Sequence, residues 1–122
     1  MDLHGVHDWM QPRSSANWLI TERDSYKTPP DLKEAIETAW RSSPVSSIKT
    51  WKSPVLLIHG DDDRNVRFGQ TVDLASRLEK YGVPFEEMVL PDELHAFLLY
   101  KSWIKANAAT VSFLDKYLKP NK

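Results

Sequence analysis

Cysteine is absent from this 122-residue sequence. Its absence excludes disulfide bonds, thiolate metal sites and a cysteine nucleophile. Neither sign of charge dominates, because 16 basic and 17 acidic residues leave a formal net charge of −1 at pH 7. Nucleic acids are bound by clustered basic side chains, so we expect no nucleic-acid partner. No stretch approaches the roughly 20 apolar residues of a membrane-spanning helix, and we expect no membrane partner either.

The composition divides the chain into two unequal parts. Residues 1–50 are expected to form an irregular loop followed by one helix, since the stretch from Gln11 to Pro30 is rich in proline, serine and asparagine. A helix is predicted over residues 31–41, where Asp31 offers an N-cap and apolar side chains recur at helical spacing. The apolar positions of this helix are Leu32, Ala35, Ile36, Ala39 and Trp40.

Residues 51–122 alternate between strand and helix patterns. The apolar run Val55-Leu56-Leu57-Ile58-His59 predicts a strand at residues 54–59 that is buried on both faces. Further strands are predicted near residues 1–6 and 85–90, and helices over residues 68–81 and 101–118. Strands that alternate with helices indicate a three-layer α/β fold, whose mostly parallel sheet has about three strands.

The two later helices each carry an apolar stripe that we expect to face the sheet. The expected inward positions are Phe68, Val72, Ala75 and Leu78 on the first, and Ile104, Ala108, Val111, Leu114 and Leu118 on the second, widened by Trp103, Phe113 and Tyr117.

Ionisable residues cluster in the two loops that follow the later strands. Asp61, Asp62 and Asp63 follow the first of these strands, and His95 follows the second. Reactive groups of parallel sheets collect at the carboxyl ends of the strands. With an acid after one strand and a histidine after the next, the carboxylate can orient the imidazole for proton transfer.

Other interpretations of these residues stay open. The Asp-rich loop also fits a solvated turn or a hard-metal site, although the sequence lacks the Asp-x-Asp-x-Asp-Gly pattern of a calcium loop and indicates no metal and no cofactor. His59, inside an apolar run, is expected to be a buried core residue. His4, His7 and Asp8 form a second cluster, which we expect to be an exposed loop.

Three segments together resemble the carboxyl-terminal part of the catalytic domain in the prolyl oligopeptidase family of serine peptidases. They are Leu56-Leu57-Ile58-His59-Gly60-Asp61-Asp62-Asp63-Arg64-Asn65-Val66, Leu78-Glu79-Lys80-Tyr81-Gly82-Val83-Pro84 and Asp92-Glu93-Leu94-His95. The resemblance runs from about residue 44 to the end, and the opening residues from Asp2 to Trp9 are similar to the strand and loop after the nucleophile segment. It implies an α/β-hydrolase-like fold, with Asp63 as the catalytic acid and His95 as the catalytic histidine. Asp61 and Asp62 would then have no proton-transfer role.

The sequence departs from this family at the nucleophile. None of the four glycines has a serine two positions later, so the G-x-S-x-G turn that exposes a serine is absent. We therefore interpret the chain as a carboxyl-terminal fragment, residues 1–122, of an α/β-hydrolase catalytic domain that is inactive alone. The resemblance implies a short peptide or ester as substrate of the complete enzyme. We also expect a homo-oligomer or an association with the missing half of the hydrolase. The alternative is a non-catalytic α/β module for interaction or self-association.

Overall fold

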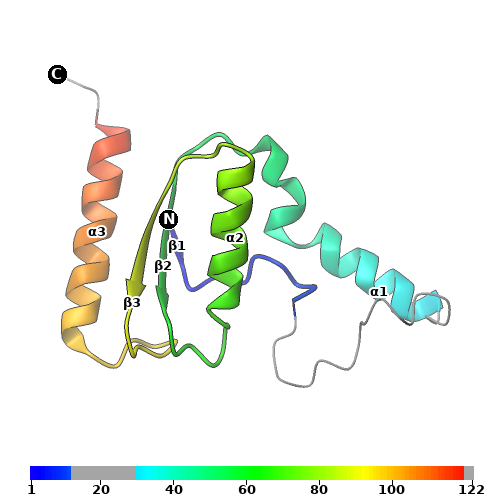
Figure 1. Ribbon diagram of the computed structural model, residues 1–122, viewed down its shortest axis with the longest axis horizontal. Coiled ribbons are helices and arrows are strands. Elements are labelled where there is room, and N and C mark those ends of the chain that lie inside the picture. Colours follow the sequence, from blue (N-terminus) through cyan, green and yellow to red (C-terminus); the bar gives the residue numbers. More distant parts are fainter. Residues whose placement is uncertain (12–29, 120–122) are drawn as a thin grey trace.

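The computed structural model describes residues 1–11 and 30–119, except for the side chain of Pro30 (Figure 1). The elements are β1 (Asp2–Leu3), α1 (Pro30–Arg41), the 3₁₀ helix η2 (Pro44–Thr50), β2 (Val55–Gly60), α2 (Gly69–Lys80), β3 (Phe85–Leu90) and α3 (Tyr100–Leu118). The strands form one parallel sheet in the order β1-β2-β3. The expected α/β class is confirmed. The loop expected from Gln11 to Pro30 lies almost wholly outside the described residues.

Strand β2 is the centre of the core because both of its faces are covered. Successive side chains of a strand point to opposite faces. Figure 1 shows α2 on one side of the sheet and α3 on the other. Leu57 belongs to the cluster with residues of α2 and η2, whereas Leu56 and Ile58 belong to the cluster with residues of α3. The first cluster contains Val45, Ile48, Leu57, Leu74, Leu78 and Val83, and the second contains Leu56, Ile58, Leu90, Phe97, Ala106 and Phe113. The β-branched and leucine-rich run therefore forms a strand buried between two helical layers, as the sequence predicts.

Strand β1 is shorter than the predicted span of residues 1–6. Leu3 pairs with Ile58, and the N–H of His4 still donates to the carbonyl of Ile58 at 2.8 Å. The backbone of His4 then adopts a φ of 42°. This left-handed conformation cannot continue a strand, so the chain turns away from the sheet at His4.

The buried face of α2 agrees with the prediction in part. Leu78 is buried and Ala75 packs against the core, as predicted, whereas Val72 is exposed. Leu74 and the polar residues Gln70 and Thr71 are buried in addition. The two polar side chains lie inward because they hydrogen-bond to groups outside the helix: the Gln70 carbonyl oxygen accepts the N–H of His7 at 3.0 Å, and the Thr71 hydroxyl lies 2.6 Å from Nδ1 of His59 in β2. Hydrophobic spacing does not encode these hydrogen bonds.

The predicted inward face of α3 is wrong. Ile104, Ala108, Val111, Leu114 and Leu118 are all exposed, with 74% of Leu118 accessible. The buried residues of the helix are Ser102, Ala106 and Phe113. Ala106 and Phe113, of which only Phe113 was predicted to face inward, pack in the apolar cluster with Leu56 and Ile58 of β2, and Ser102 is buried because its hydroxyl donates to Glu93. The apolar stripe of α3 is consequently left on the outer side.

Helix α1 begins one residue earlier than predicted, at Pro30, so Asp31 lies in its first turn and not at the cap. Leu32, Ile36 and Ala39 are half-buried, whereas Trp40 is exposed. None of the helices in the described part of the chain is long and apolar enough to cross a lipid bilayer.

Candidate active site

The loops after β2 and β3 lie side by side because the two strands are parallel and end in register, with Gly60 opposite Leu90. The Asp61 carboxylate accepts the backbone N–H of Asp92 at 2.7 Å and joins the two loops. Asp62 is exposed and pairs with Arg64 at 3.2 Å. Neither aspartate approaches an imidazole in the hydrogen bonds of the described residues, so both lie outside the proton-transfer geometry.

Gly60 allows the second loop to cross the end of β2. A methyl group added at Gly60 would collide with the backbone carbonyl of Glu93. Any larger residue at this position would displace the Glu93 backbone, and with it the nearby His95. The close approach of the two loops thus requires glycine, which has no side chain, at position 60.

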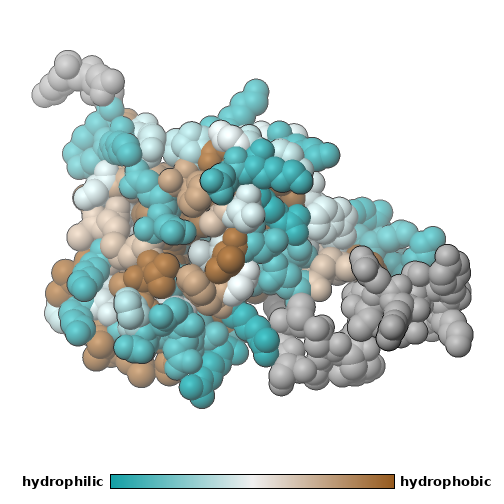
Figure 2. All heavy atoms as spheres, viewed as in Figure 1, coloured by the Kyte–Doolittle hydropathy of each residue, from teal (hydrophilic) through white to brown (hydrophobic). Residues whose placement is uncertain are grey.

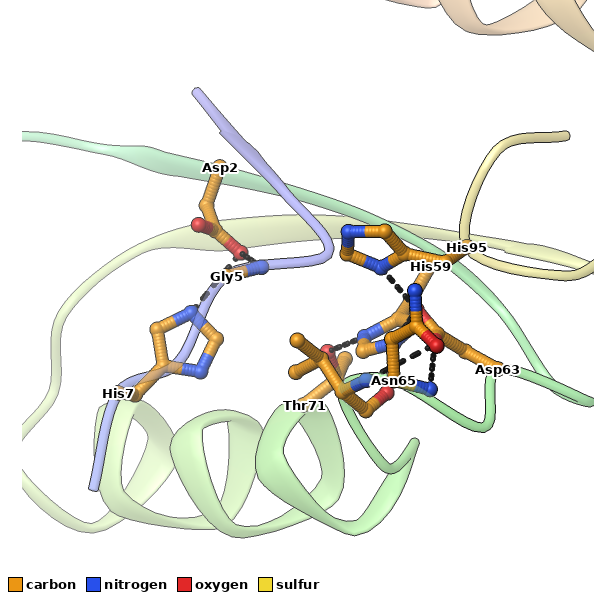
Figure 3. Close-up of polar contacts among 9 residues, drawn as sticks. Asp2, Gly5, His7, His59, Asp63, Asn65, Thr71 and His95 are labelled. Carbon is orange, nitrogen blue, oxygen red and sulfur yellow. Dashed lines mark hydrogen bonds and ion pairs between the residues drawn. The ribbon is translucent and has the colours of Figure 1, made fainter. Parts of the chain in front are cut away.

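Asp63 is the most constrained residue of the first loop. Its Oδ1 atom accepts the backbone N–H groups of Asn65 and Val66, both at 2.9 Å, in an Asx turn (Figure 3). The side chain is fully buried. Its Oδ2 atom therefore has one fixed direction, towards the loop that carries His95.

The Asp63 Oδ2 atom lies 2.8 Å from Nδ1 of His95 (Figure 3). Burial alone would raise the pKa of the Asp63 carboxyl, but hydrogen bonds from His95, Val66 and Asn65 outweigh it and lower the pKa. An ionised carboxylate cannot donate, so Nδ1 of His95 must carry the proton. The Nε2 atom of a neutral His95 is then a free base on a side chain that is 34% exposed.

His59 is completely buried, as expected, and supports Asp63 from the inner side. Its Nε2 atom lies 3.1 Å from Asp63 Oδ2 and 2.9 Å from the carbonyl oxygen of Val66. Both partners only accept, so Nε2 carries the proton and Nδ1 accepts from the Thr71 hydroxyl at 2.6 Å. His59 is a positioning residue for Asp63, with no ring nitrogen free for chemistry.

Glu93 is a buried carboxylate whose role the sequence analysis missed. It accepts the Ser102 hydroxyl at 2.5 Å and the backbone N–H groups of Leu98 and Leu99 at 2.6 and 3.2 Å. It thereby fixes the loop that carries His95 to the first turn of α3. The hydrogen bond from Ser102, followed by those from Leu98 and Leu99, lowers the pKa of the Glu93 carboxyl. Glu93 lies too far before α3, which begins at Tyr100, for a helix-capping pattern in the sequence to indicate this role.

Glu93→Gln is expected to weaken the pH dependence of stability in acid. A carboxyl with a lowered folded pKa stabilises the fold above its unfolded pKa of about 4.5, and this contribution is lost as the pH falls through the folded pKa. Urea unfolding between about pH 3 and 6 measures the dependence, with exposed Glu34→Gln as the control for loss of one charge. Equal slopes for Glu93→Gln and wild type would contradict the role of this carboxylate.

His4, His7 and Asp8 do not form the exposed loop that the sequence suggested. His7 and Asp8 are buried, because Gln70 binds their backbone and the His7 Nε2 atom bonds to Asp2 at 2.8 Å (Figure 3). His4 lies against His95, with their ring centroids 4.0 Å apart. Of these three residues, His4 therefore lies beside the candidate site, whereas His7 and Asp8 are anchored to α2 and to Asp2.

Comparisons with known proteins identify the family of this chain. A model of the prolyl oligopeptidase family matches residues 1–121. Dipeptidyl-peptidase 5 of Porphyromonas gingivalis is 28% identical over 83 residues, which are 68% of this chain and 12% of that protein. Venom dipeptidyl peptidase 4 of Vespula vulgaris is 38% identical over 79 residues, which are 64% of this chain and 10% of that protein.

Solved structures share the fold. A puromycin-hydrolyzing peptidase of Mycobacterium tuberculosis superposes with a TM-score of 0.65 at 24% identity, over 76% of this chain and 14% of that chain. The acylaminoacyl peptidase of Pyrococcus horikoshii gives a TM-score of 0.64 at 21% identity, over 70% of this chain and 15% of that chain. The sequence spans only about a tenth of the curated relatives named above. With the family model covering nearly every residue, this chain belongs to the prolyl oligopeptidase family.

Proposed function

We propose that this chain supplies the acid and the histidine of a serine-peptidase catalytic triad, with Asp63 as the orienting acid and His95 as the general base. The observation that carries the proposal is the 2.8 Å bond from His95 Nδ1 to a buried carboxylate that two backbone N–H groups hold in place. Family membership supports the same assignment. The substrate class that follows is a short peptide or an ester.

The chemistry of these two residues is proton transfer. His95 Nε2 takes the proton of a serine hydroxyl while the serine oxygen bonds to the carbonyl carbon of the substrate. The imidazolium that forms is stabilised by the Asp63 carboxylate at Nδ1. His95 then returns the proton to the leaving amine or alcohol as the carbon–heteroatom bond breaks. Water attacks the acyl-enzyme in the same way, and His95 again accepts and returns one proton.

The serine itself is proposed to come from outside these 122 residues, since they contain no G-x-S-x-G motif. We expect the isolated chain to give no labelling with a fluorophosphonate probe and no turnover of peptide or ester substrates. Mass spectrometry of the probe-treated chain measures this. Stoichiometric modification of any serine in the chain would contradict the interpretation that the isolated chain is inactive.

The same probe tests the proposed roles of Asp63 and His95 in a hydrolase that contains both this segment and the nucleophilic serine. The serine of that enzyme should react with the probe, and His95→Ala should abolish the reaction because no base then activates the hydroxyl. Exposed Lys105→Ala on α3 is the matched control and should react like the wild type. If the His95→Ala variant reacted with the probe as fast as the wild type, His95 would be excluded as the general base.

A second candidate function is self-association, and it rests on the outer face of α3. Ile104, Val111, Leu114 and Leu118 are exposed there, and Figure 2 shows apolar atoms gathered on the surface over the first turns of this helix. Within the described residues β1 pairs only with β2, which leaves its other edge open. Exposed apolar faces and open edges promote pairing with another chain.

Sedimentation of the 122-residue chain at micromolar concentrations is expected to show dimers or larger species. Replacing Ile104 and Leu118 by lysine should shift the population towards monomer, because two apolar contacts are exchanged for repelling charges. A compact and well-folded wild-type monomer under these conditions would exclude self-association through this face.

A further inference from the structure

Three side chains with metal-ligating atoms meet at the carboxyl edge of the sheet, each from beyond the end of a different strand. They are His4 after β1, Asp63 after β2 and His95 after β3, and their ligand atoms all lie within 4.8 Å of one another. The rings of His4 and His95 meet edge to face, with their centroids 4.0 Å apart. Segments distant in sequence thus bring two imidazoles and one carboxylate to one point.

The kinds of ligand atom at this point favour some metal ions over others. Zn²⁺ binds imidazole nitrogen and carboxylate oxygen at about 2.0–2.2 Å, and open zinc sites use three protein ligands and one water. Ca²⁺ takes about 6–8 oxygen ligands, and Mg²⁺ keeps a largely aqueous octahedral shell. Two imidazole nitrogens and one oxygen therefore favour zinc over either of these ions.

We propose that His4, Asp63 and His95 form a binding site for Zn²⁺. Binding requires the three ligand atoms, which lie within 4.8 Å of one another, to reach the edge lengths of a zinc tetrahedron, about 3.3 Å for bonds near 2 Å. Asp63 Oδ2 and His95 Nδ1, now 2.8 Å apart, have to separate slightly, and His4 has to approach them. The proton on Nδ1 of His95 moves to Nε2 of the same ring, so that Nδ1 offers its lone pair to the metal.

The carboxylate of this site is preorganised by its surroundings. The backbone N–H groups of Asn65 and Val66 hold Oδ1 of Asp63, and the buried His59 ring contacts Oδ2 at 3.1 Å. Hydrogen bonds of this kind orient metal ligands and raise metal affinity. The carboxylate ligand is thus held in place before a metal ion binds.

His4 is held in a conformation that serves this placement. Its φ of 42° is unfavourable for a histidine, and its N–H bond to the Ile58 carbonyl anchors the turn. The ring contacts the rings of His95, His59 and Phe97. A neutral imidazole ring offers the lone pair of one nitrogen to a metal ion.

Zinc bound here would inhibit the proton transfer, a consequence that rests on the proposed function. A metal ion on Nδ1 of His95 leaves the ring proton on Nε2, so Nε2 can no longer accept the serine proton, and the ion also binds the Asp63 carboxylate that otherwise orients the ring. Metal binding itself does not depend on turnover. Failure of zinc to bind would therefore leave the acid and histidine assignment unaffected, and failure of that assignment would leave the metal site standing.

Calorimetric titration of the 122-residue chain with Zn²⁺ tests the site. We expect one ion per chain and no comparable binding of Mg²⁺. His4→Asn should weaken zinc binding by more than about 100-fold, the upper end of the loss seen when a supporting residue alone is removed. Asparagine tolerates the left-handed backbone, so circular dichroism should show an unchanged fold. Exposed Asp62→Asn, beside the site in sequence, should bind zinc like the wild type.

A second readout needs no variant. In NMR spectra of the wild type, Zn²⁺ should shift the ring resonances of His4 and His95 together, while those of buried His7 stay in place. The proposal is overturned if the wild type binds no zinc, if His4→Asn binds it equally well, if Asp62→Asn loses it, or if His7 responds in place of His4.

Discussion

Asp63→Asn is expected to lower turnover by about 10⁴-fold in a hydrolase that contains this segment and its nucleophile. The reason lies in the Asx turn. The N–H groups of Asn65 and Val66 require an acceptor at the Oδ1 position, so the asparagine carbonyl must stay there. Its NH₂ group then faces His95 Nδ1, which has to accept. The His95 proton moves to Nε2, and the base that would face the serine is gone.

The control for this variant is Asp62→Asn, which removes the same charge from an exposed neighbour that pairs only with Arg64 among the hydrogen bonds of the described residues. It should keep turnover near the wild-type value. Because the acid and the histidine act as a unit, the double variant Asp63→Asn, His95→Ala should be about as inactive as His95→Ala alone. Turnover of Asp63→Asn within tenfold of the wild type, with folding intact by circular dichroism, would exclude Asp63 as the orienting acid.

Leu57→Ala is expected to lower the free energy of unfolding by about 2–5 kcal/mol. Leu57 has no exposed surface and lies at the centre of β2, packed with Leu74 and Leu78 of α2. Truncation removes buried apolar surface and leaves a cavity between a strand and a helix that cannot collapse without breaking the sheet. A domain of this size has only about 5–15 kcal/mol of stability in total, so much of it would be lost.

Urea unfolding monitored by tryptophan fluorescence measures the effect. Val72→Ala on α2 is the matched control, because this side chain is 54% exposed, and its change should stay within about 0.5 kcal/mol. A Leu57→Ala variant as stable as Val72→Ala would contradict the placement of β2 between two helical layers.

Strands and helices could be predicted from local patterns, because β2 is a short apolar run, β3 alternates in part between apolar and polar residues, and α2 and α3 have helical spacing. The strand and helix order then placed the Asp63 and His95 loops at one edge of the sheet. The inner face of α3 could not be predicted in this way. Hydrophobic spacing selected the stripe through Ile104 and Leu118, but the buried side chains include Ala106, which packs in the core, and Ser102, which hydrogen-bonds to Glu93.

The supporting residues of the site could not be predicted because their roles depend on contacts between distant segments. Gln70 holds the backbone of His7, which is 63 residues away, and His4 reaches His95 only after a left-handed turn at its own backbone. Glu93 binds Ser102 across a loop whose path depends on Gly60. No periodicity of a single segment encodes such contacts.

The tautomer of His95 tests the central claim most directly, since the claim requires a neutral ring with its proton on Nδ1 and a free lone pair on Nε2. The measurement is the ¹⁵N chemical shifts of both His95 ring nitrogens in the wild-type chain and in Asp63→Asn, above the pH at which the ring protonates. We predict a protonated Nδ1 and a bare Nε2 in the wild type, and the reverse in Asp63→Asn. A wild-type ring that carries its proton on Nε2, or a tautomer that does not respond to Asp63→Asn, would contradict the account.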